Sequence, residues 1–161
     1  MDLLAHFQML ARYNRLANER LYEKCAQLDS AEYQRQRPGS FASIRGLLNH
    51  ILRGDQIWMP RFEGTNQPAQ LASFDTFPEL QSARCAMDAH IESFFAQPQP
   101  GFLDRPLTYV NTTGQQCTDD TSTAVAHLFN HQTHHRGQVH VMLAQTSVAP
   151  PALDLHRIIH P

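Results

Sequence analysis

The chain has 161 residues, a formal net charge of -2 and a hydrophobic fraction of 42%. A chain of this length is expected to form a single domain with its own core, here residues 1–161. The nearly balanced charge excludes the strongly basic surface that holds a nucleic-acid backbone, so we expect no nucleic-acid partner.

The N-terminal segment and the cysteines indicate where the protein works. The start Met-Asp-Leu-Leu-Ala-His lacks the basic and apolar regions of a signal peptide, and no apolar run is long enough to span a bilayer. We therefore expect a soluble, cytoplasmic protein with no membrane partner. Three widely spaced cysteines without a Cys-x-x-Cys motif predict ordinary reduced thiols: Cys25, Cys85 and Cys117.

The first predicted element is a long amphipathic helix over residues 2–28, because apolar residues recur there every three or four positions. Asn14 lies in the same apolar stripe. A buried amide needs hydrogen-bond partners, so Asn14 either links helices in the core, which we favour, or faces a functional site. Residues 29–39 contain Pro38 and Gly39 and are predicted to be a connection.

The second predicted helix runs from Ser40 to about Pro60, with the serine as a capping residue and the proline as a helix breaker. One face of this helix carries His50, with Gly46 four residues before it and Gly54 four residues after it. Each glycine weakens the helix by about 1 kcal/mol relative to alanine. That cost is reasonable if another helix or a ligand approaches closely at these positions.

Residues 60–75 are predicted to be a loop, and a capping box followed by proline predicts a third helix over residues 76–98. His90 lies at the edge of the apolar stripe of this helix and is predicted to be a packed or interface histidine. Residues 103–117 are rich in Thr, Tyr, Val and Asn around a glycine, which predicts a small β-hairpin. The fourth helix is predicted over residues 118–146, opened by polar and acidic side chains.

Five of the ten histidines lie within the fourth predicted helix. At about 100° per residue, His131 and His135 fall in the middle of its apolar stripe. Imidazoles four residues apart project from adjacent turns, and both can reach one metal ion. A single histidine on an apolar face is usually a hydrogen-bonded core residue, but four ring nitrogens in a dry core are hard to satisfy. The pair therefore favours a metal site and predicts a third ligand on another helix.

His50 is the natural third ligand, because metal sites in helical bundles are built from side chains on facing helices. We therefore predict an all-α fold, an antiparallel four-helix bundle with a small β-hairpin before the last helix, in which His50, His131 and His135 bind one divalent metal ion. His127 with His131 is an alternative pair. His134 lies about 60° from the centre of the stripe and is expected to be exposed or in contact with a ligand.

Three segments of the sequence resemble the DinB/YfiT-like family of metalloproteins. The family consists of four-helix bundles and is named for a damage-inducible protein unrelated to the DNA polymerase of the same name. The segments are Tyr-Asn-Arg-Leu-Ala-Asn at 13–18, Leu-Leu-Asn-His-Ile-Leu at 47–52 and His-Leu-Phe-Asn-His-Gln-Thr-His-His-Arg-Gly-Gln-Val at 127–139. The resemblance implies that one histidine of the second helix and a His-x-x-x-His pair of the last helix hold the metal, which again selects His50, His131 and His135.

Three imidazole ligands leave at least one coordination position open for water or substrate. Zinc, nickel and ferrous iron all accept imidazole, and histidine ligands alone do not choose between them. We expect zinc or nickel, with iron as a further candidate. Polar side chains that contact the ligands fix the tautomer and orientation of each ring. The candidates for that role are Asn14, Asn49, Asp55 and Gln138.

Two functions fit these features. The first is a metal-dependent enzyme that acts on a small molecule, of the thiol S-transferase, isomerase or hydrolase type, in which the ion activates a low-molecular-weight thiol or a water. The thiol is implied by the resemblance, because members of that family include thiol S-transferases and a thiol-dependent isomerase. The second is a non-catalytic, metal-binding stress-response protein in which the metal braces the bundle. In both cases we expect a homodimer.

Overall fold

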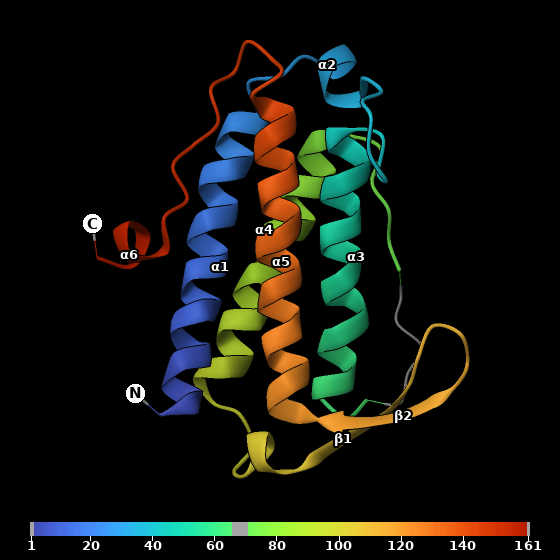
Figure 1. Ribbon diagram of the computed structural model, residues 1–161, viewed down its shortest axis with the longest axis vertical. Helices are drawn as coiled ribbons and strands as arrows, with labels where there is room; N and C mark the ends of the chain where they lie inside the picture. The colour runs from blue at the N-terminus through green and yellow to red at the C-terminus, as the bar shows by residue number, and fades with distance from the viewer. Residues whose placement is uncertain (1, 66–70, 161) are drawn as a thin grey trace.

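The protein is mostly helical, and the computed structural model describes residues 2–65 and 71–160. Four long helices lie side by side (Figure 1): α1 (Leu3–Cys25), α3 (Ile44–Phe62), α4 (Phe77–Ala96) and α5 (Thr121–Leu143). Helices α1 and α3 each pack against both α4 and α5. The predicted helical segments are confirmed. None of the described helices combines the length and apolar character of a membrane span.

The direction of each helix follows from contacts near the helix ends. Gln8 Nε2 donates to the Phe95 carbonyl at 3.1 Å, so the start of α1 lies beside the end of α4. Asn49 Nδ2 donates to the Phe74 carbonyl at 3.0 Å, so α3 and α4 begin at the same end of the molecule. Figure 1 shows α1 and α5 running in one direction and α3 and α4 in the other. The neighbours α3 and α4 are thus parallel, which differs from the predicted antiparallel order.

The first turn of α3 differs from the prediction, because the helix begins at Ile44 rather than Ser40. Ser43 is the capping residue, and its Oγ accepts a hydrogen bond from the Gly46 N–H at 3.1 Å. A Cβ at position 46 would collide with the carbonyl oxygen of Phe41. Gly46 therefore lets the chain before α3 fold closely over the first turn of the helix. This agrees with the prediction of a close approach at this glycine. Pro60 does not end the helix but lies inside its last turn.

Two strands, β1 (Pro106–Val110) and β2 (Gln116–Asp120), form the antiparallel hairpin that the sequence predicted. A short 3-10 helix, η1 (Phe102–Asp104), precedes it. Residues 118–120 belong to β2 and pair with β1, so α5 begins later than predicted. An isolated hairpin is only marginally stable. This one is held by the buried side chain of Leu107 and by Arg61 Nη2, which donates to the Val110 carbonyl at 3.1 Å.

Two short helices were missed at the sequence level. Helix α2 (Ser30–Gln34) lies within the segment predicted to be a connection, and the Asp29 carboxylate caps it through the Glu32 N–H at 2.7 Å. Helix α6 (Leu155–Ile159) lies in the C-terminal tail and packs on α1. The predicted loop at 60–75 includes residues 66–70, which lie outside the described residues, and its described part after α3 contains no helix or strand.

A buried polar network lies between two apolar clusters of the core, and all four long helices contribute to it. The Asp55 carboxylate accepts hydrogen bonds from Arg84 and Gln132. The network continues through two asparagines of α1, Asn14 and Asn18. Both donate hydrogen bonds to the Asp88 carboxylate, and their side-chain oxygens accept hydrogen bonds from the Arg136 guanidinium. The favoured interpretation of Asn14 as a polar link between helices is confirmed.

Candidate metal centre

His50 of α3 and the pair His131 and His135 of α5 point their imidazole rings at one another. Nε2 of His50 lies 3.1 Å from Nε2 of His131 and 3.1 Å from Nε2 of His135. One ring nitrogen from each residue lies within 4.8 Å of the others. The pair occupies adjacent turns of α5, and α3 runs antiparallel to α5 beside it (Figure 1). The structure therefore brings the three predicted residues together, while metal binding by them remains a prediction.

Gly54 makes room for one of these rings. A Cβ at this position would lie 2.7 Å from Cε1 and 3.1 Å from Nδ1 of His131, and contacts that short are not tolerated between packed carbon atoms. The absent side chain allows the His131 ring to lie against the backbone of α3. The predicted close approach at Gly54 is confirmed, and the approaching group is a histidine of the site itself.

Two further side chains fix the orientation of the rings. The ring of Phe41, in the segment before α3, stacks on His50 with a centroid separation of 4.1 Å and meets His135 edge to face at 5.3 Å. Gln138 Oε1 lies 2.8 Å from Nδ1 of His135. When this Nδ1 carries the proton and donates to Gln138, Nε2 keeps a free lone pair, and this Nε2 lies 3.1 Å from Nε2 of His50.

Burial keeps the three imidazoles neutral. Desolvation, followed by the proximity of His135 and His50, lowers the pKa of His131 to about 4. Desolvation also lowers the pKa of His50, and it lowers that of His135 against the opposing hydrogen bond to Gln138. Neutral imidazole is the form that binds a metal. The site therefore has its ligands in the binding form at neutral pH.

The donor set fits a metal ion. Nitrogen ligands at about 2.0–2.1 Å from a tetrahedral zinc ion lie roughly 3.3 Å apart, close to the 3.1 Å from Nε2 of His50 to each of the other two Nε2 atoms. All three ring nitrogens lie within 4.8 Å of one another. Without an ion, Nε2 of His50 would have to serve two neighbouring Nε2 atoms, although a neutral ring nitrogen carries either one proton or one lone pair. In addition, Nδ1 of His131 is buried and has no hydrogen-bond partner among the described residues. A cation shared by the three Nε2 atoms would satisfy their lone pairs, whereas Nδ1 of His131 would still lack a partner in the described part of the chain.

The other histidines and polar candidates lie outside the group of three. His127 has its ring centroid 6.0 Å from that of His131 and stands beside Trp58 instead. His134 is exposed, and its Nε2 lies 3.3 Å from Gln138 Nε2. His90 pairs with Glu63 at 2.6 Å on the surface.

Of the four candidates for orienting the histidines, Gln138 contacts one of the group of three, His135. Asn49 instead holds the chain before α4 through the backbone of Phe74. Asn14 and Asp55 belong to the buried network of the core.

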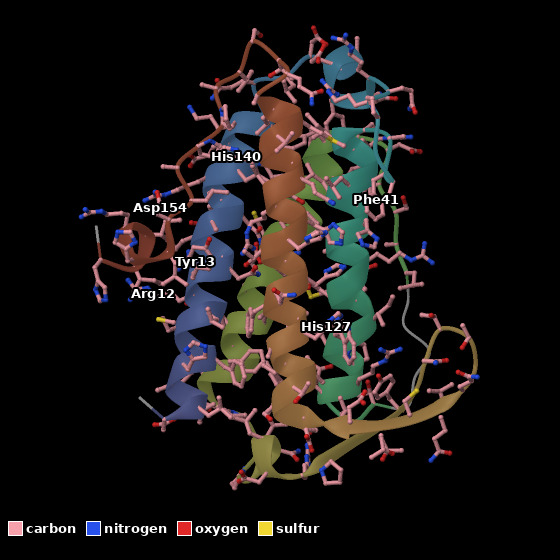
Figure 2. The ribbon with its side chains drawn as sticks, in the orientation of Figure 1. Arg12, Tyr13, Phe41, His127, His140 and Asp154 are labelled. Carbon is pink, nitrogen blue, oxygen red and sulfur yellow. The ribbon has the colours of Figure 1, made fainter. Side chains whose placement is uncertain are left out.

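A cavity of about 330 Å³ opens beside His50 and His131 and extends to the hairpin. Figure 2 labels Phe41 beside the upper half of α3 and His127 beside its lower half, and the cavity lies on the side of His127. Its wall includes residues that the sequence reasoning missed: Arg53, Arg61 and Tyr109. A signal was present for the first two, because positions 50, 53, 54, 57, 58 and 61 recur at the spacing of one helix face.

All three cysteines are free, in agreement with the prediction of reduced thiols. Cys25 is buried in the core, and desolvation raises the pKa of its thiol to about 12. The thiolate is the nucleophilic form of cysteine. Cys25 is therefore inert at neutral pH, and it is not a candidate nucleophile.

Fold and site together define a class: helical proteins that gather three neutral imidazoles from two neighbouring helices, with a cavity at the open side of the cluster. The DinB family model matches residues 3–161, and the chain belongs to the DinB family. It is similar to Protein DinB of Bacillus subtilis (strain 168), with 26% identity over 154 residues that span 90% of this chain and 88% of that protein. The predicted family resemblance is confirmed.

Proposed function

We propose that the protein is a metal-dependent enzyme in which His50, His131 and His135 hold one divalent ion with an open coordination position. The observation that carries this proposal is the convergence of three Nε2 atoms, 3.1 Å apart for both pairs that include His50, at the edge of a cavity. Zinc and nickel suit the imidazole ligands, and iron is a further possibility. The scaffold would be a four-helix bundle, supported by the pairwise packing of the four long helices.

The proposed reaction class is activation of a low-molecular-weight thiol or a water for attack on a small electrophile. A divalent ion at such a site supplies Lewis acidity, which favours the deprotonated form of a coordinated thiol or water. The residues of the chain prepare the site: Gln138 orients the His135 ring, Phe41 covers two of the imidazoles, and Gly54 admits the third. The cavity leaves one side of the cluster accessible to a substrate.

The first test is elemental analysis of protein purified without added metal. We expect about one ion per chain in the wild type and loss of that ion in His131→Ala. His134→Ala is the matched control, because it removes an exposed histidine of the same helix that lies outside the group of three. Equal metal content in the two variants would overturn the proposed site.

The second test separates an enzyme from a metal-braced stress-response protein. Metal-loaded wild type and His50→Ala are compared for turnover of an electrophile, such as 1-chloro-2,4-dinitrobenzene, with a panel of small thiols. An enzyme gives metal-dependent turnover that His50→Ala loses. Bound metal with no turnover for any thiol, together with a large rise in melting temperature on metal loading, would favour the non-catalytic function instead.

A further inference from the structure

The cavity beside the histidines has a positively charged wall. Arg53 and Arg61 line it, and no acidic side chain does. Neither arginine forms an ion pair with a carboxylate within residues 2–65 and 71–160. Segment 66–70, Asn-Gln-Pro-Ala-Gln, carries no acidic side chain that could fill that role. The cavity therefore offers an anion two guanidinium groups that lack carboxylate partners.

Arg61 is the more preorganised of the two. Its guanidinium carbon lies 4.7 Å from the centre of the Trp58 ring and 4.3 Å from the centre of the Tyr109 ring. Its Nη2 donates to the Val110 carbonyl at 3.1 Å. Stacking on aromatic faces holds the planar fork in place and leaves its remaining N–H groups available. An arginine immobilised in this way loses little side-chain entropy when it binds an oxyanion.

The position of Arg61 sets the size of the molecule that would fit. Arg61 lies seven residues after Gly54, which touches the His131 ring, and a helix rises about 1.5 Å per residue. A group bound at Arg61 is thus about 10 Å along the axis of α3 from the histidines. The volume of about 330 Å³ lies at the lower end of the range for small-molecule sites. Ile57 and Trp58, which lie between these two positions of α3, and Tyr109 at the Arg61 end add apolar wall.

We propose that the substrate is a small organic carboxylate, with its carboxylate at Arg61, an apolar segment along Trp58 and its reactive end at the three histidines. This inference names the substrate class for the proposed function and rests on that function for the reactive end. One guanidinium fork matches one carboxylate in both geometry and charge. Arg53 is exposed, and Arg61 is the arginine held in place by its neighbours. The second negative charge of a phosphate dianion would have no preorganised partner among the described residues of the cavity wall, so the carboxylate is favoured.

The test uses Trp58 as its reporter, because it is the only tryptophan in the sequence. Metal-free wild type is titrated with 4-phenylbutanoate, with its neutral analogue 4-phenylbutanamide and with 4-phenylbutyl phosphate, while tryptophan fluorescence is recorded. We expect saturable binding of the carboxylate and at least roughly tenfold weaker binding of the amide, since the charge-assisted hydrogen bonds are lost. Equal binding of carboxylate and amide would overturn the proposal, and tighter binding of the phosphate would overturn the choice of carboxylate.

Variants identify the arginine. Arg61→Gln is expected to weaken carboxylate binding at least roughly tenfold, and Arg61→Lys, which keeps the charge and a donor for Val110, is expected to weaken it less. Arg105→Gln is the matched control, because Arg105 also stacks on an aromatic ring, that of Phe102, but does not line the cavity. Wild-type affinity in Arg61→Gln and Arg61→Lys would overturn the role of Arg61. The titration needs no metal, so a failure of metal binding at the histidines would leave it unaffected and would be recognised separately.

Discussion

Replacement of Gly54 with alanine adds one methyl group, which has two opposing effects. Alanine in place of Gly54 favours the helix by about 1 kcal/mol, but its Cβ would lie 2.7 Å from Cε1 of His131. We expect Gly54→Ala to stay folded and to bind metal roughly ten- to hundredfold more weakly, the range found when the support of a metal ligand is lost. Isothermal titration with zinc measures this change.

Gly137 provides the control, because it is also a helical glycine but a Cβ there would meet no atom within 4 Å. Gly137→Ala should raise the free energy of unfolding by up to about 1 kcal/mol and leave zinc affinity unchanged. Equal zinc affinity in Gly54→Ala and Gly137→Ala would contradict the idea that Gly54 makes room for a ligand.

The lowered pKa of His131 predicts how stability of the metal-free protein depends on pH. The ring has a pKa near 6.5 in the unfolded chain and about 4 in the folded protein, so the unfolded state binds more protons between these values. Stability is therefore retained above pH 6.5 and falls as the pH drops toward 4. Melting temperatures from pH 7.5 to 4.5 should fall more steeply in wild type than in His131→Ala. Parallel curves would count against a neutral, desolvated His131.

At the scale of elements, α5 carries both histidines of the proposed ligand pair and the side chain that contacts one of them. Gln138 lies three residues after His135 and contacts its Nδ1 at 2.8 Å. Gln138→Met removes this acceptor and should weaken zinc binding roughly ten- to hundredfold, whereas Gln138→Glu keeps an acceptor and should restore most of the affinity. Competition with a chromogenic chelator measures both variants. If Gln138→Met and Gln138→Glu weaken binding equally, the hydrogen bond does not orient the ring.

The elements differ in how well the sequence could predict them. The histidine pair was predictable because its four-residue spacing and its apolar neighbours lie within one helix. The start of α3 was not, because Ser40 and Ser43 are both good caps and the choice depends on the Phe41 carbonyl folding over Gly46. Residues 118–120 look like the polar opening of a helix, but pairing with β1 holds them in a strand. Tertiary contacts decided both boundaries.

At the scale of the molecule, the buried network connects the four long helices behind the histidines. The side chains of Asp55 and Arg84 are 0% and 1% exposed and form an ion pair. Asp55→Ala would leave the buried Arg84 guanidinium with one carboxylate partner fewer in the core. We expect a loss of about 3–5 kcal/mol in the free energy of unfolding. Urea unfolding followed by circular dichroism measures this loss.

Asp75 offers the matched control, because it also pairs with an arginine, Arg45, but its side chain is 91% exposed. Asp75→Ala removes an ion pair that water screens, so we expect little change in stability. Comparable losses of unfolding free energy in Asp55→Ala and Asp75→Ala would contradict the idea that burial makes the Asp55 ion pair important for stability.

The arrangement of the helices was only partly predictable from the sequence. Apolar stripes indicate which face of each helix is buried, and Asn14 in such a stripe correctly indicated a polar link in the core. They do not specify the direction of neighbouring helices, and the parallel packing of α3 and α4 was missed (Figure 1). The cavity was missed for a related reason, since it needs Tyr109 of the hairpin to meet Arg61 of α3. Contacts between segments so distant in sequence leave no local pattern.

The central claim is that three imidazoles from two helices share one ion. X-ray absorption spectroscopy of the zinc-loaded protein tests it most directly, because the fine structure reports the number and type of atoms bound to zinc. The account predicts three imidazole nitrogens at about 2.0–2.1 Å with one or more further oxygen or nitrogen ligands. It also predicts that the imidazole signal is lost in His131→Ala but not in His134→Ala. A coordination shell of sulfur, or one with fewer than three imidazoles in the wild type, would contradict it.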